Sequence, residues 1–257
     1  MASSDPIAII TGGSRGIGLQ IARTLGENQY RVVLVARDAQ RLQAAEAELQ
    51  AAGSTCATVA ADLLAADSAE RILEATRSAF GEPDLLVNNA GTAPTAKVES
   101  TTDDMLTETL DMHVRVPLRL IRAVLPAMKA RNSGCLVQMA STAGLRGFAF
   151  TTAYTAAKHG MLGLTRAIHT ELSATGIDAY AICPGFVDTD ITREAAASIA
   201  ARGRMSADEA LAAMAAQNHI GRMHSSAEVA EAVLGVVRDR PSGCVLELDR
   251  EPPTFLD

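Results

Sequence analysis

Short apolar runs rich in β-branched residues alternate with longer helical patterns along most of the chain. The expected strands are 7–10, 32–35, 55–60, 85–87, 136–139, 178–183 and 245–248, and the expected helices are 16–27, 39–52, 68–80, 102–131, 153–174 and 227–238. A continuous apolar strand must be buried on both faces, and strands that alternate with helices form a parallel sheet with helices on each side. The sequence therefore predicts an α/β fold, a doubly wound sheet of about seven parallel strands.

The segment from about 188 to 224 interrupts this alternation. It contains two Ala-rich helical stretches, 194–201 and 207–216, and no strand. Long insertions of this kind lie at the surface and often carry substrate contacts. No linker, repeat or charge block separates the segment from the rest, and 257 residues are ordinary for one α/β domain. We therefore expect a single domain over 1–257 with a helical lid at about 188–224.

Charge and cysteine usage exclude several classes of protein. The formal net charge is −7, whereas binding to nucleic acid or anionic lipid needs clustered Lys and Arg. The N-terminus lacks a signal-peptide pattern, and no segment offers about 18 uninterrupted apolar residues. The four cysteines form no C-x-x-C pair and lie in apolar runs, as buried free thiols of a reducing compartment do. We expect a cytoplasmic protein with no nucleic-acid partner, no membrane contact and no metal site.

A glycine-rich turn follows the first expected strand and leads into the first expected helix. It reads Thr11-Gly12-Gly13-Ser14-Arg15-Gly16-Ile17-Gly18. Glycines let the backbone approach a pyrophosphate, and the free N–H groups at a helix N-terminus favour an anion. The candidate phosphate-binding residues are Gly12, Ser14, Arg15, Gly16, Ile17 and Gly18. A tight connection without a ligand is the alternative for such a turn taken alone.

The end of the second expected strand should decide between NAD and NADP. An acidic residue there accepts the ribose hydroxyl of NAD, whereas an arginine pairs with the 2′-phosphate of NADP. The strand ends in Val35-Ala36-Arg37, and Arg15 in the glycine turn is a second cation. Either arginine alone is more often a solvated surface charge. The two together, with no acid at the strand end, favour NADP(H).

A serine, a tyrosine and a lysine are spaced for carbonyl reduction. Ser141 follows the fifth expected strand, and Tyr154 and Lys158 lie four residues apart on a helix, so they share one face. A ketone that accepts hydride develops negative charge on oxygen and needs a proton donor. Tyr154 would donate this proton, its pKa lowered by the neighbouring ammonium and an oxidised nicotinamide, while Ser141 would hydrogen-bond the carbonyl oxygen. A surface helix pair is the alternative for Tyr154 and Lys158 alone.

With these motifs in order, nearly the whole chain resembles the short-chain dehydrogenase/reductase family, whose fold is a Rossmann sheet. The further marks of the family are Asp62, Asn88-Asn89-Ala90-Gly91, Pro184-Gly185 and Thr189. The resemblance implies that Asp62 and Leu63 hold the adenine, and that Asn89, Ala90 and Gly91 lie against the adenosine side. It also implies that Pro184, Gly185, Val187 and Thr189 line the nicotinamide, with Val187 and Thr189 on the carboxamide. Tyr154 and Lys158 would contact the cofactor too, with Lys158 on the nicotinamide ribose.

Two positions depart from the family pattern. His113 stands where the family usually has a catalytic asparagine, whose main-chain carbonyl holds a water of the proton relay. Three interpretations are open for His113. Its main-chain carbonyl would still hold the water, its imidazole would join the relay as a fourth catalytic group, or its side chain has no chemical role. The chain also lacks the family's C-terminal Asp-Gly-Gly. The resemblance implies a homo-oligomer, a tetramer or dimer, formed through the helical faces 110–128 and 161–172, but these apolar stripes are also compatible with a core.

The substrate is constrained less than the cofactor. The stretches around Ser141, Tyr154, Cys183 and Ile220 are similar to aromatic-polyketide ketoreductases and 3-oxoacyl-thioester reductases. This resemblance implies a small carbonyl substrate, carried on CoA or an acyl carrier protein. Arg202 and Arg204 would meet the phosphate of such a carrier or are solvated charges. Apolar walls would come from Phe148, Phe150, Phe186, Met205 and Met214, and the alternative for each of these is ordinary core packing. The alternatives are an NAD-dependent secondary-alcohol dehydrogenase and an NADP(H)-binding sensor that has lost turnover.

Overall fold

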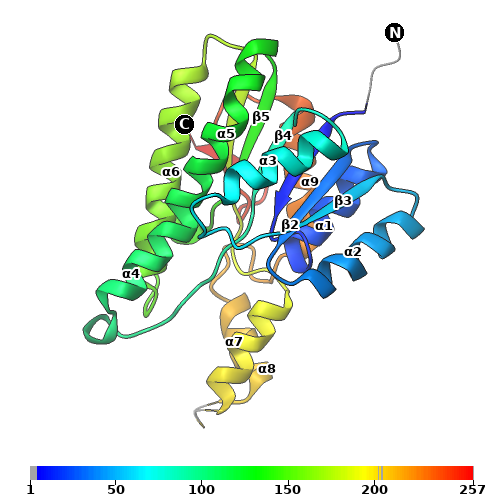
Figure 1. The fold of residues 1–257 in the computed structure, drawn as a ribbon. Helices are drawn as coiled ribbons and strands as arrows, with labels where there is room; N and C mark the ends of the chain where they lie inside the picture. Colours follow the sequence, from blue (N-terminus) through cyan, green and yellow to red (C-terminus); the bar gives the residue numbers. More distant parts are fainter. Residues whose placement is uncertain (1–4, 202, 204, 257) are drawn as a thin grey trace.

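The computed structural model describes residues 5–201, 203 and 205–256, and this part of the chain is built on a sheet of eight strands (Figure 1). The strands are β1 (Ile7–Thr11), β2 (Arg31–Ala36), β3 (Cys56–Ala60), β4 (Leu85–Asn88), β5 (Gly134–Met139), β6 (Ile177–Cys183), β7 (Val245–Glu247) and β8 (Thr254–Leu256). Their order is β3-β2-β1-β4-β5-β6-β7-β8, and all neighbours are parallel except β7 and β8. The predicted doubly wound parallel sheet is confirmed.

The last strand adds to the seven parallel strands that the sequence predicts. β8 has three residues and pairs antiparallel with β7. It follows Pro252 and Pro253, and proline has no N–H to donate to a sheet. A three-residue strand behind two prolines is too short to show a periodicity, so the sequence does not reveal it.

Helices cover both faces of the sheet (Figure 1). The helices of the described residues are α1 (Gly16–Glu27), α2 (Ala39–Ala51), α3 (Ser68–Ala79), α4 (Asp103–Leu110), α5 (Val116–Arg131), α6 (Thr152–Leu172), α7 (Asp190–Ala201), α8 (Ala207–Ala215) and α9 (Ser226–Asp239). On one face α1, α2 and α9 pack with Ala8 and Ile10 of β1, and on the other α3 and α5 pack with Ile9. Both faces of β1 are therefore buried, which explains the unbroken apolar run from Ile7 to Ile10. Within the described residues, no helix is long and apolar enough to cross a membrane.

The expected helix 102–131 is divided by a π-helical segment, η2 (Asp111–Arg115). In this segment the N–H of Val116 bonds the carbonyl of Asp111, five residues earlier. Pro117 follows at the start of α5 and has no N–H for the carbonyl of His113, four residues earlier. The loss of this bond gives a physical reason for the change of winding, and such π-bulges are frequent at functional sites.

The segment between β6 and α9 extends beyond the carboxyl edge of the sheet (Figure 1). Its helices α7 and α8 pack on each other through Ala196, Ala210 and Met214. The first helix begins at Asp190, four residues earlier than expected, and the second ends at Ala215. At the base of the segment, Val187 forms a β-bridge with His224.

Candidate active site

The predicted site residues gather at the carboxyl edge of the sheet. The strand order reverses between β1 and β4, and ligands of open α/β sheets bind outside the carboxyl ends of strands at such a switch point. The glycine turn follows β1, Asn89 follows β4, Ser141 follows β5 and Pro184 follows β6. Segments far apart in the sequence are thus brought to one edge.

Gly18 is required for the packing of α1 against β1. A Cβ on Gly18 would lie 2.2 Å from the carbonyl oxygen of Gly12 and 2.6 Å from the side-chain nitrogen of Asn89. Gly12 itself has φ of +67°, which favours glycine, and its N–H donates to the carbonyl of Val35 at 2.8 Å. The first turn of α1 therefore packs directly against the turn that follows β1, with no room for a side chain at Gly18.

The N-terminus of α1 is open to an anion. Its N-cap is Arg15, which makes no side-chain cap, and its first turn holds no acidic residue. By contrast, Asp38, Ser206 and Ser225 cap α2, α8 and α9 through their side chains. Ser14, Arg15, Gly16 and Ile17 are all partly exposed. The first-turn N–H groups and the positive end of the helix dipole are thus available to a pyrophosphate, so these residues fit a dinucleotide.

Asn89 joins the loop after β4 to the glycine turn. Its side-chain nitrogen donates to the carbonyl of Thr11 at 2.9 Å, and Thr11 Oγ1 accepts from the N–H groups of Asn89 and Ala90 at 2.9 and 3.0 Å. Gly91 lies against His113, because a Cβ there would be 2.3 Å from the imidazole. This loop is therefore held on one side by the turn and on the other by the helix that carries His113.

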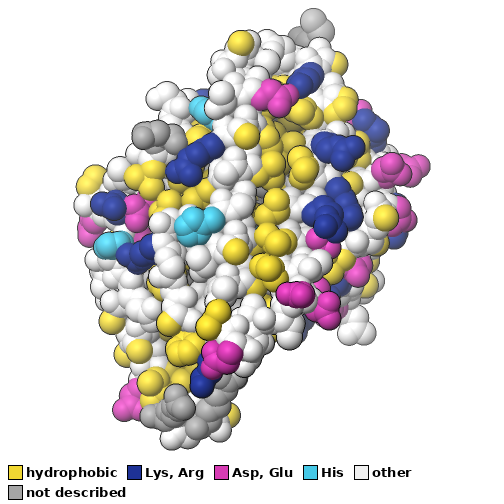
Figure 2. Space-filling view, turned by 90° about the vertical axis from the view of Figure 1, so that its left-hand side faces the viewer, with side chains coloured by type: hydrophobic (Ala, Val, Ile, Leu, Met, Phe, Trp, Pro, Cys, Tyr) yellow, Lys and Arg dark blue, Asp and Glu magenta, His cyan; other side chains and the backbone are white. Residues whose placement is uncertain are grey.

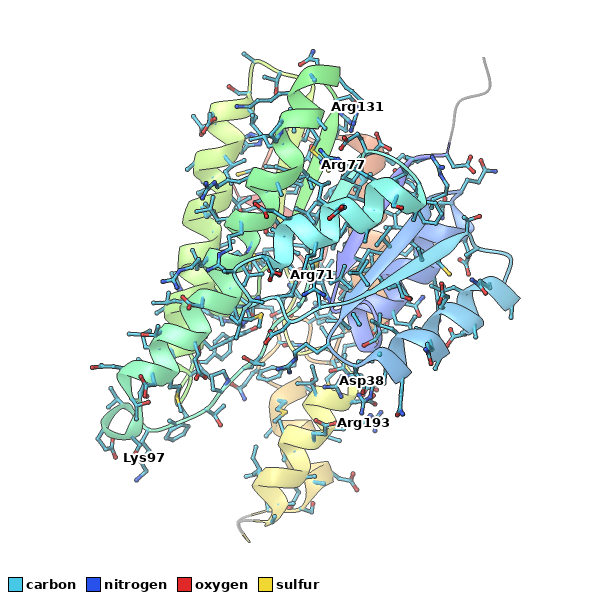
Figure 3. All side chains as sticks on the ribbon, viewed as in Figure 1. Asp38, Arg71, Arg77, Lys97, Arg131 and Arg193 are labelled. Atoms are coloured by element: carbon cyan, nitrogen blue, oxygen red, sulfur yellow. The ribbon has the colours of Figure 1, made fainter. Side chains whose placement is uncertain are left out.

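The edge of the sheet beyond β2 carries an exposed arginine. Arg37 is exposed and, within the described residues, makes no hydrogen bond or ion pair, whereas Arg15 pairs with Glu194 of α7 at 3.4 Å. Asp38 follows Arg37, but its carboxylate accepts the N–H groups of Gln40 and Arg41 at the start of α2 (Figure 3). The carboxylate that directly follows Arg37 in the chain is thus occupied as a helix cap.

Asp62 and Leu63 lie at the end of β3. Asp62 is exposed, and its carboxylate accepts the N–H of Leu64 at 3.1 Å. The side chain of Leu63 is buried in the core against α3. Asp62 has a side chain free to meet a ligand, whereas Leu63 offers only main-chain atoms.

Ser141, Tyr154 and Lys158 lie together at the centre of the edge. Burial raises the pKa of Tyr154 to about 12, although a hydrogen bond with Ser141 lowers it. The Lys158 ammonium lies 5.5 Å from the centroid of the Tyr154 ring and donates to the carbonyl of Met139 at 2.6 Å. Burial lowers the pKa of Lys158 to about 7. The protein itself therefore raises the pKa of Tyr154 and does not lower it as expected, because the cost of desolvating the phenolate is larger than the effect of its polar neighbours.

His113 packs beside this cluster. Its ring meets the ring of Tyr154 edge-on at 5.4 Å, and Nε2 lies 2.7 Å from the carbonyl oxygen of Thr92. Burial, and next the charge of Lys158, lower the pKa of His113 to about 3. The imidazole is neutral, and Nε2 must carry the proton because a carbonyl only accepts. Nδ1 is then a buried acceptor with no partner among the described residues.

The loop after β6 closes the other side of the site. Pro184 is buried, and Gly185 packs so closely on Asn218 that a Cβ would lie 2.3 Å from its side-chain oxygen. The side chain of Val187 is in the core, so only its main chain is available to a ligand. Thr189 is partly exposed, and its hydroxyl hydrogen-bonds that of Thr192 at 3.1 Å.

The predicted apolar walls divide into two groups. The rings of Phe148 and Phe186 meet edge-on at 6.2 Å, and Phe150 and Met205 are exposed. Met214 belongs to the core of the lid, where it packs with Ala196 and Ala210, so it is not a wall. Arg202 and Arg204 lie outside the described residues.

Two partners of the site residues could not be predicted from the sequence. Lys158 and His113 hydrogen-bond the main-chain carbonyls of Met139 and Thr92. Such partners leave no signal in a sequence because any residue supplies a carbonyl.

Comparisons with known proteins agree with this geometry. The family model for short chain dehydrogenases matches residues 6–200. A Streptomyces coelicolor protein named as a ketoacyl reductase is 34% identical over 91% of this chain and 90% of its own length. The 3-oxoacyl-acyl-carrier-protein reductase FabG of Escherichia coli K12 is 32% identical over 91% of this chain and 90% of its own. A variant of actinorhodin polyketide ketoreductase, solved with NADPH, superimposes with a TM-score of 0.87 at 33% identity, covering 92% of each chain. The chain therefore belongs to the short-chain dehydrogenase/reductase family.

Proposed function

We propose that this chain is an NADP(H)-dependent ketoreductase that transfers a hydride between the nicotinamide and a carbonyl or secondary alcohol. The observation that carries the proposal is the cluster of Ser141, Tyr154 and Lys158 beside an uncapped helix N-terminus at the switch point of the sheet. The family relatives named as ketoacyl reductases support the same chemistry. The cofactor supplies the hydride, and the protein supplies the proton and the positioning.

Tyr154 is the proton donor in this proposal. Because its pKa is raised to about 12, the phenol is fully protonated at neutral pH and is ready to donate to an oxygen that gains negative charge. Ser141 hydrogen-bonds the same oxygen. Lys158, with a pKa of about 7, is the more acidic group, and it would return a proton to Tyr154 after the phenol has donated its own.

Arg37 is the main determinant of NADP(H) in this proposal, because it is unpaired while Asp38 is occupied as a cap. Arg37→Asp is expected to weaken NADPH binding about 10- to 100-fold, since a charge-assisted hydrogen bond contributes about 1.5–3 kcal/mol. Binding of NADH should be unchanged or stronger. Arg77→Asp, on α3 far from Asp38 (Figure 3), makes the same charge change as a control. A wild type that prefers NADH would refute the assignment.

His113 acts through its main-chain carbonyl in this proposal. Pro117 leaves that carbonyl without its usual helical donor, and a free carbonyl can hold a water of the relay whatever the side chain. His113→Asn is therefore expected to keep or raise kcat in a steady-state assay. A loss of about 100-fold or more, the size of a lost acid–base group, would instead assign the relay to the neutral Nδ1.

The substrate is proposed to be a 3-oxoacyl thioester or a polyketide-like ketone, carried on CoA or an acyl carrier protein. The names of the relatives support this class, and the edge-on pair Phe148 and Phe186 offers an apolar surface. NADPH oxidation over a panel of ketones and 3-oxoacyl thioesters tests the proposal, with 3-oxoacyl thioesters expected among the best substrates. A panel without turnover, with NADPH binding intact, would favour a cofactor sensor.

A homo-oligomer in the cytoplasm completes the proposal. Figure 2 shows a band of hydrophobic side chains on the face formed by α4, α5 and α6, and Leu118 of α5 is among the exposed apolar residues. A second copy of the chain would cover this band, as a tetramer or dimer, which sedimentation equilibrium would test. The four cysteines are buried free thiols, as suits a reducing compartment. The residues 188–224 would act as a lid over the substrate.

A further inference from the structure

We propose that the buried carboxylate of Asp249 is a positioning residue, which joins the three loops that border the reacting centre. Asp249 follows β7 and is fully buried. The proposal rests on the ketoreductase function, since it assigns the seat of the substrate in the same site.

The carboxylate has three nitrogen neighbours from distant parts of the chain. Oδ2 accepts the main-chain N–H of His219 at 2.9 Å and lies 3.5 Å from the guanidinium of Arg146. Oδ1 lies 3.4 Å from Nε2 of His224, which is also buried. Burial lowers the pKa of His224 more than Asp249 raises it, so Arg146 is the cation that balances the carboxylate at neutral pH.

Each neighbour belongs to a segment at the edge of the site. Arg146 lies five residues after Ser141, in the connection between β5 and α6. His219 and His224 lie where the lid returns to α9, and His224 hydrogen-bonds Phe186 and Asp188 through its main chain. The third segment is the loop after β6. It packs directly on the carboxylate, because a Cβ on Gly185 would lie 3.0 Å from Cγ of Asp249.

Arg146 extends this connection to the aromatic surface. Its guanidinium lies 5.2 Å from the centroid of the Phe148 ring, donates to the carbonyl of Gln217 at 3.0 Å and hydrogen-bonds the imidazole of His219. Phe148 in turn meets Phe186 edge-on. A continuous set of contacts therefore runs from Asp249 to both aromatic rings proposed to face the substrate.

Burial of a carboxylate costs several kcal/mol unless its oxygens are paired and hydrogen-bonded. For Asp249 the hydrogen bonds reach Oδ2 only, from His219 and Arg146, which lie 30 and 103 positions away in the chain. Within the described residues Oδ1 has no hydrogen-bond partner, and Nε2 of His224 lies 3.4 Å from it. Movement of the segment that carries Arg146 or of the segment that carries His219 would remove a partner of this buried charge, so the carboxylate opposes such movement. Glu247, two residues earlier, is also buried, but it pairs with its neighbour Arg250 and does not join separate loops.

The test compares Asp249→Asn with the matched control Glu247→Gln, both of which neutralise a buried carboxylate on the same strand segment. Hydrogen exchange is measured on the protein without substrate, and kcat, KM for the ketone and Kd for NADPH are measured in the assay. We expect Asp249→Asn to speed exchange in 142–148, 184–188 and 217–224 together and to raise KM about tenfold or more, the scale of a misplaced substrate. Glu247→Gln should change neither the exchange in these three segments nor KM.

Arg146→Gln is a second variant at a half-exposed position, and it is expected to give the same kinetic change. The two changes combined should cost less than the product of the single effects, because they remove one shared interaction. Faster exchange confined to the C-terminal segment, or a KM shift no larger than that of Glu247→Gln, would overturn the positioning role. Failure of wild-type turnover would refute the proposed function instead, and the exchange data would still decide the role of Asp249.

Discussion

Tyr154→Phe is expected to lower kcat about 1000-fold while NADPH binding stays unchanged. The substitution removes only the hydroxyl, and the phenyl ring keeps its edge-on contact with His113. An acid–base group contributes about 10²–10⁴ to a rate, and no other side chain at the site combines a fully protonated hydroxyl with contacts to both Ser141 and Lys158 in the described residues. Single-turnover NADPH oxidation with a ketone, and fluorescence titration of NADPH, measure the two quantities.

Tyr180→Phe is the matched control for this loss. Its hydroxyl is buried as well and donates to the carbonyl of Pro241 at 3.0 Å, away from the carboxyl edge. Its removal should cost about 1 kcal/mol of stability and leave kcat unchanged. A Tyr154→Phe enzyme with wild-type turnover would refute the assignment of the proton donor, and with it the proposed mechanism.

Most of the parallel strands could be predicted because they are buried on both faces, whereas the outer strand β3 is only partly buried. Along β1, Ala8 and Ile10 face one layer of helices and Ile9 faces the other, so every position from Ile7 to Ile10 is apolar and the run stands out in the sequence. The same reasoning fails at β8, where three residues behind two prolines pair at the sheet edge. It also fails at η2, because the effect of Pro117 on the carbonyl of His113 changes the winding of a helix without changing its apolar pattern.

The positions of the site residues could be predicted more readily than their protonation. The spacing of Tyr154 and Lys158 places them on one helix face, and the structure brings both beside Ser141. Spacing carries no information about burial, however, and burial determines the direction of both pKa shifts. The contacts of Asp249 could not be predicted from the sequence, because its partner Arg146 is 103 residues away in the chain.

Lys158→Met is expected to abolish turnover and yet to stabilise the protein at low pH. The pKa of Lys158 falls from an ordinary value of 10.5 to about 7 in the folded protein. Between these two values the unfolded chain binds a proton that the folded protein does not, so the free energy of unfolding rises with pH across this window. Below pH 7 the folded protein carries the full cost of the buried charge, about 5 kcal/mol at about 1.4 kcal/mol per pKa unit.

Methionine removes this cost but also removes the hydrogen bond to the carbonyl of Met139, a loss of about 1–3 kcal/mol. The variant should therefore gain about 2–4 kcal/mol at pH 6, and the gain should shrink as pH rises toward 10, where the wild-type lysine is neutral. Urea unfolding at pH 6, 8 and 10 measures it. Lys129→Met, at an exposed position paired with Glu171, should show no such trend. A Lys158→Met protein less stable than wild type at pH 6 would mean that the ammonium is stabilised where it lies, and that its charge is a structural contribution as well as a proposed catalytic one.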